Sequence, residues 1–112
     1  MSIIALFLAF SLTIPAQATN RAIGADVELL FSGNTATCAV FITAANSGDD
    51  IEAVIELWQG NSRIKMWEES AEAVLDFSKT ASVSTGKSYT LTVNYTVNGV
   101  ACPMASASGT CK

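Results

Sequence analysis

The sequence predicts an all-β protein folded as one antiparallel sandwich of about seven strands. Apolar and polar residues alternate along most of residues 20–112, and a period of two is typical of strands that bury one face. Gly, Asn and Ser interrupt this alternation every ten residues or so, as turns between short strands do. Two packed sheets of antiparallel strands account for both observations.

The strands are expected, in chain order, at residues 25–31, 35–44, 51–58, 63–67, 73–77, 89–97 and from 100 onwards. Ser32-Gly33-Asn34 is the turn between the first two. In the second strand, Cys38, Val40 and Ile42 should share a buried face. A loop over Asn46–Asp50 follows, since Asn, Ser, Gly and Asp favour turns.

The third and fourth strands are predicted to form a hairpin around Gly60-Asn61, because both residue types tolerate the backbone of a tight turn. On one face this register pairs Leu57 with Ile64 and Ile55 with Met66; on the other it pairs Trp58 with Arg63, Glu56 with Lys65 and Val54 with Trp67. Each pair is favourable across a hairpin, which supports the register.

Residues 68–79 are compatible with two structures. Glu69–Leu75 contains good helix formers and permits a short helix. Ala73, Leu75 and Phe77 instead continue the period of two, and we prefer a strand over Ala73–Phe77.

Tyr89–Val97 alternates most regularly, and Asn98-Gly99 after it is a strong hairpin signal. Folding back at this turn opposes Val97 with Val100, Tyr95 with Cys102 and Val93 with Met104. Pro103 has no N–H to donate, so the last strand should lie at a sheet edge.

The segment Val83-Ser84-Thr85-Gly86-Lys87-Ser88-Tyr89 resembles the corner of fibronectin-type and immunoglobulin-like domains, where the Tyr hydroxyl bonds back to the backbone. The chain also resembles a group of small secreted bacterial proteins of unknown function. That resemblance rests on Thr37-Cys38, Leu57-Trp58-Gln59-Gly60, Gly86-Lys87-Ser88-Tyr89-Thr90-Leu91 and Cys111. It implies an immunoglobulin-like sandwich outside the cytoplasm and no known activity.

Residues 1–18 are predicted to be a signal peptide. Ile3–Ile14 is an almost unbroken apolar run, Pro15 ends it, and Ala16-Gln17-Ala18 has the small-x-small pattern of a cleavage site. Cleavage after Ala18 would release residues 19–112 as one secreted domain with no membrane partner. No Lys or Arg precedes the run, so an uncleaved segment that holds the protein at the membrane is the alternative.

Composition argues against several functions. A net charge of −4 disfavours nucleic-acid binding, which needs a basic surface. The chain has no histidine, and therefore lacks the commonest general acid–base group and zinc ligand. No two cysteines have zinc-site spacing either. We expect no catalytic residues, no metal and no cofactor.

Cys38, Cys102 and Cys111 all follow the cleavage site. In an oxidising compartment, two of the three are expected to pair. The resemblance implies a Cys38–Cys111 bridge, which closes a loop of about 70 residues and would contribute ~4 kcal/mol in the chain-entropy model. Cys38–Cys102, Cys102–Cys111 and no disulfide at all remain alternatives.

Trp58 and Trp67 are the candidate binding residues. In the predicted register they share a face with Arg63 and Val54, and two indoles beside a guanidinium suit a sugar ring or a protein partner. The alternative is that the indoles cover a neighbouring strand or loop. We therefore expect an extracellular binding or adhesion module for a glycan or protein ligand. A structural or interaction subunit or effector of the cell exterior is the alternative, and a small hydrolase is a third.

Overall fold

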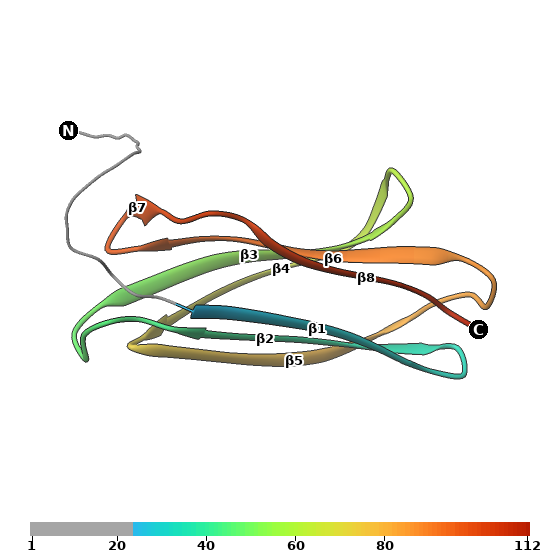
Figure 1. Ribbon diagram of the computed structural model, residues 1–112, viewed down its shortest axis with the longest axis horizontal. Coiled ribbons are helices and arrows are strands. Elements are labelled where there is room, and N and C mark those ends of the chain that lie inside the picture. Colours follow the sequence, from blue (N-terminus) through green and yellow to red (C-terminus); the bar gives the residue numbers. More distant parts are fainter. Residues whose placement is uncertain (1–23) are drawn as a thin grey trace.

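The computed structural model describes residues 24–112, which form two antiparallel sheets packed face to face (Figure 1). The smaller sheet has the order β1 (Gly24–Ser32), β2 (Thr35–Thr43), β5 (Val74–Ser82). The larger sheet has the order β4 (Ser62–Glu72), β3 (Asp50–Gln59), β6 (Ser88–Val97), β7 (Val100–Ala101), and β8 (Ala105–Thr110) also pairs with β6. The described part of the chain is therefore an all-β sandwich. The predicted signal peptide and its cleavage site lie outside the described residues.

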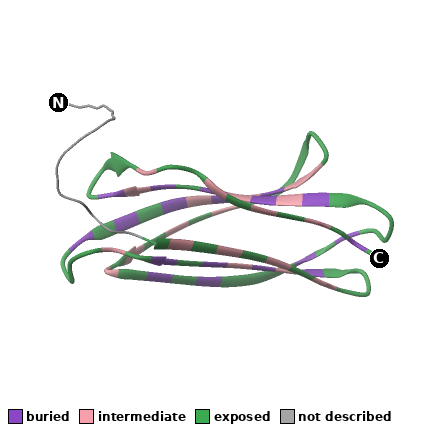
Figure 2. Ribbon diagram, viewed as in Figure 1, coloured by how far each residue is buried: buried purple, intermediate pink, exposed green. Residues whose placement is uncertain are grey.

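The core lies between the two sheets and is built from alternate residues of the strands. Cys38, Val40 and Ile42 of β2 are at most 1% exposed, which confirms the predicted buried face. Figure 2 shows buried and exposed residues alternating along the strands. The larger sheet contributes its own alternate residues, among them Ile51, Ile55, Leu57, Leu91, Val93 and Val97.

The connection between the sheets before β6 contains the bond from the backbone to the Tyr89 hydroxyl that the resemblance implied. The Ser84 N–H donates to the Tyr89 hydroxyl at 2.7 Å, and that hydroxyl donates to Gln59 Oε1 at 3.3 Å. Gly86 has φ +86° in the turn between them, a conformation that favours glycine. Tyr89 is 1% exposed, so its ring is part of the core while its hydroxyl fixes the corner.

Residues 68–79 contain no helix, and the preferred strand over Ala73–Phe77 is found as the first part of β5, one residue later. β4 continues to Glu72, and β5 begins at Val74 after Ala73, whose φ is 68°. The Ala73 N–H donates to the Asp49 carbonyl at 2.8 Å, and the Ala44 N–H donates to the Ala73 carbonyl at 2.9 Å. These bonds to the β2–β3 connection hold the chain where it passes from one sheet to the other.

The last predicted strand is divided in two. Val97 pairs with Val100 as predicted, and the Cys102 N–H donates to the Tyr95 carbonyl at 3.0 Å. Val93 then pairs with Ala105 instead of Met104, because residues 102–104 leave the ladder around Pro103. Both short strands lie at the edge of the larger sheet, as the proline predicted.

Candidate functional site

A β-bulge in the β3–β4 hairpin alters the predicted binding face. The pair Trp58–Arg63 forms as predicted, but the register then shifts between Leu57 and Trp58, and Leu57 pairs with Lys65. Ile64 is the extra residue of the bulge. The predicted pairs Leu57–Ile64, Ile55–Met66, Glu56–Lys65 and Val54–Trp67 are therefore wrong.

Trp67 faces the interior of the sandwich as a result. It pairs with Ile55, which is fully buried, and its ring packs on Phe77 of β5 with centroids 5.3 Å apart. One extra residue reverses the face of every residue that follows it in the strand. The prediction that Trp58 and Trp67 form one platform is therefore wrong, and the alternative that Trp67 covers a neighbouring strand is correct.

Trp58, Arg63 and Val54 lie on the outer face of the larger sheet. The Trp58 Nε1–H donates to Thr92 Oγ1 at 3.3 Å, so the partly buried indole leans from β3 onto β6. Arg63 Nη1 donates to Glu56 Oε2 at 2.9 Å in an ion pair beside the indole. This face thus presents one flat aromatic ring bordered by charged and hydroxyl groups.

Hydroxyl groups cover the rest of this face on β6 and β8. Ser88 and Thr110 Oγ atoms lie 3.1 Å apart, and Thr90 Oγ1 lies 3.1 Å from Ser108 Oγ. Such cross-strand hydroxyl pairs stabilise the edge modestly. They also leave a polar surface next to Trp58, with both donors and acceptors.

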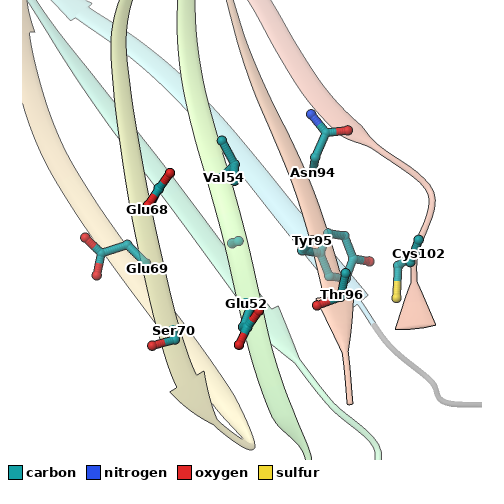
Figure 3. Close-up of a pocket in the computed structure, with 11 residues that line it drawn as sticks. Glu52, Val54, Glu68, Glu69, Ser70, Asn94, Tyr95, Thr96 and Cys102 are labelled. Carbon is teal, nitrogen blue, oxygen red and sulfur yellow. The ribbon is translucent and has the colours of Figure 1, made fainter. Parts of the chain in front are cut away.

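A groove of about 660 Å³ lies on the outer face of the larger sheet, and its lining residues do not include Trp58. Figure 3 shows these residues on their strands. The lining residues come from β3, β4, β6 and the segment after it: Glu52, Ala53, Val54, Glu68, Glu69, Ser70, Asn94, Tyr95, Thr96, Ala101 and Cys102. Three of them are carboxylates, and none is a Lys or Arg. Sequence reasoning missed this groove, since it requires knowing that β4 and β6 flank β3.

Tyr95 and Cys102 lie behind the groove: Tyr95 is 8% exposed and faces the core beside Ala53, and Cys102 packs against the same core. Burial raises the pKa of the Tyr95 hydroxyl above its ordinary value, and the nearby Cys102 thiol raises it further. The Tyr95 hydroxyl points towards Cys102 in Figure 3, and Cys102 Sγ donates to the Val100 carbonyl at 3.7 Å. The phenol belongs to the core face of β6, so the groove offers a ligand mainly the carboxylate, amide and hydroxyl groups of its outer-face residues.

The three cysteines form no disulfide in the structure, so the Cys38–Cys111 bridge implied by the resemblance is absent. Cys111 Sγ donates to the Gly33 carbonyl at 3.2 Å, at the turn where β2 begins. Cys38 lies further along β2, on the order of 10 Å from that turn at the usual rise per residue. The Cys111 thiol thus bonds to the backbone of the β1–β2 turn instead of to Cys38.

We expect the stability of the protein to fall at alkaline pH through Cys38. Burial raises the pKa of this thiol from 9.0 to about 11, whereas the unfolded chain ionises it above pH 9. The unfolded state then binds fewer protons, and the free energy of unfolding should drop by about 2 kcal/mol between pH 8 and 10.5. Urea unfolding in reducing buffer at the two pH values measures this drop. Cys38→Ala should lose less over the same interval, and an equal loss in both proteins would contradict the assignment.

Within residues 24–112 the structure holds no helix of the length and hydropathy that a membrane span requires. Over the same range, no group of three or more Cys, Asp and Glu side chains is placed to hold a metal ion. No protein-family model, curated protein or solved structure matches the chain.

Proposed function

We propose that this protein is a secreted, immunoglobulin-like binding module whose ligand surface is the outer face of the larger sheet. The N-terminal apolar run supports secretion. The order β1-β2-β5 facing β4-β3-β6, with β7 and β8 beyond β6, supports the immunoglobulin-like type. The hydrogen bond from the Ser84 N–H to the Tyr89 hydroxyl, at the corner before β6, supports it as well.

The observation that carries the binding proposal is the position of Trp58. Its indole lies against the sheet with Thr92 as hydrogen-bond partner, so one broad apolar surface is available beside hydroxyl groups and the Arg63–Glu56 pair. Sugar rings present an apolar face edged by hydroxyls and match such a surface. We therefore favour a glycan ligand for this face, bound without catalysis or cofactor.

A protein ligand is the second candidate. Met66 lies on the same outer face, opposite Glu56, and is 44% exposed, while Ile64 of the bulge is 37% exposed. Exposed apolar side chains next to a tryptophan are typical of protein interfaces. This arrangement fits a structural or interaction subunit of the cell exterior.

Removing the Trp58 indole should abolish most ligand binding. We expect Trp58→Ala to weaken binding at least tenfold on a glycan array, which corresponds to the loss of about 1.4 kcal/mol. Phe41→Ala is the matched control, because Phe41 is an aromatic residue 42% exposed on the outer face of the smaller sheet.

Two results would overturn the glycan assignment. One is equal binding by the wild type and Trp58→Ala, and the other is no glycan binding by the wild type. Pull-down of one defined protein from culture supernatant, lost in Met66→Ser, would instead support the protein ligand.

A further inference from the structure

We propose that β4 pairs with β4 of a second copy of this chain, which gives a two-fold symmetric dimer with one continuous sheet. Within the larger sheet β4 has β3 as its hydrogen-bonded neighbour on one side, and no described strand pairs with its other side. An edge strand of this length, Ser62–Glu72, presents unpaired backbone N–H and C=O groups to a further strand.

The first half of β4 is open to such a partner. Every residue from Ser62 to Met66 is exposed, although the segment is paired with β3. Figure 1 shows the tip of the β3–β4 hairpin standing away from the two layers. Ile64 and Met66 are both large and apolar, and a second strand would cover part of their surface.

Charge identifies the second copy as the partner. The first half of β4 carries Arg63 and Lys65, and the second half carries Glu68, Glu69 and Glu72. An antiparallel pair of identical strands places each first half beside the second half of its neighbour. Opposite charges can therefore meet on both sides of the two-fold axis.

One register is favoured by the faces of the side chains. With Trp67 on the two-fold axis, Lys65 lies opposite Glu69 of the partner subunit, and the reverse pair forms by symmetry. Lys65 and Glu69 pair with Leu57 and Ala53 of β3, two buried residues on one face. The two charged side chains thus share a face, as cross-strand neighbours must.

The opposite side of the sandwich does not offer the same complementarity. β1 is the edge of the smaller sheet there, and its charged residues are Asp26 and Glu28, both acidic. Two copies of β1 paired antiparallel would set like charges against each other. Charges on an edge strand usually keep copies apart, whereas on β4 they are separated by sign and favour self-association.

The dimer has one further consequence, which rests on the proposed function of the Trp58 surface. A two-fold axis through the shared sheet puts the outer faces of both larger sheets on the same side. Two Trp58 surfaces then face one direction, which permits bivalent attachment to a repeating ligand.

Sedimentation equilibrium over a concentration series tests the proposal. We expect a monomer–dimer equilibrium for the wild type, weakened at least tenfold by Lys65→Glu and likewise by Glu69→Lys. The double charge swap Lys65→Glu/Glu69→Lys should restore it, because the salt-bridge pair is rebuilt in the opposite sense. Lys87→Glu, the same charge change in an exposed loop, is the control, and far-UV circular dichroism verifies that each variant is folded.

The proposal is overturned by a wild type that stays monomeric up to millimolar concentration. It is also overturned if Lys65→Glu dimerises as well as the wild type, or if the double swap fails to recover the loss. These readouts contain no ligand, so their failure leaves the Trp58 binding proposal standing.

Discussion

Trp67→Ala should lower the free energy of unfolding by about 3 kcal/mol, whereas Trp58→Ala should cost about 1 kcal/mol. Trp67 packs between the sheets on Phe77, and truncating a core tryptophan typically costs ~3–5 kcal/mol. Trp67 is partly buried, which places it at the low end. Trp58→Ala removes one hydrogen bond and the contacts of a partly exposed indole, which is a smaller loss. Urea unfolding followed by far-UV circular dichroism measures both changes.

Met66→Ala is the control that separates the two possible registers of the hairpin. In the structure Met66 faces outwards and is 44% exposed, so its truncation should cost roughly 0.5 kcal/mol or less. In the register without a bulge, Met66 would face the core and Trp67 the solvent, and the order of the two costs would reverse. A larger loss for Met66→Ala than for Trp67→Ala would therefore refute the observed register.

Local patterns predicted most of the secondary structure and the core faces. Cys38, Val40 and Ile42 alternate with less buried residues, and the period of two alone assigns them to the interior. The hydrogen bond to the Tyr89 hydroxyl was likewise predictable, because Ser84, Gly86 and Tyr89 all lie in one short segment of the chain. Short stretches of sequence are therefore sufficient to predict these strands and their buried faces.

The bulge at Ile64 had no comparable signal. Residues 63–66 alternate basic and apolar side chains, a pattern that a regular strand with a buried face also shows, yet all four are exposed. The hairpin tip stands away from the two layers (Figure 1), so no burial selects a face there. The groove and the cysteine positions depend on which distant strands are neighbours, and one sequence does not show this.

Asp49→Ala should destabilise the protein by about 3 kcal/mol, although Asp49 lies in a connection with no regular structure. Its side chain is 7% exposed. Oδ1 accepts from Asn98 Nδ2 at 2.9 Å and Oδ2 accepts from the Asn46 N–H at 3.0 Å. Its carbonyl accepts from Ala73 at 2.8 Å. Asp49 therefore joins the β2–β3, β4–β5 and β6–β7 connections at one end of the sandwich. Hydrogen bonds to a charged group contribute about 1.5–3 kcal/mol each, and alanine removes both bonds of the carboxylate.

Asp50→Ala is the matched control for this effect. Asp50 is exposed and contacts Asn98 through its backbone: its N–H donates to Asn98 Oδ1 at 2.8 Å, and its carbonyl accepts from the Asn98 N–H at 2.7 Å. Alanine preserves both bonds, so the cost should be within about 0.5 kcal/mol. Asp49→Asn keeps one acceptor oxygen and should fall between the two. Equal losses for Asp49→Ala and Asp50→Ala in urea unfolding at pH 7 would show that the buried carboxylate does not hold the β2–β3 and β6–β7 connections together.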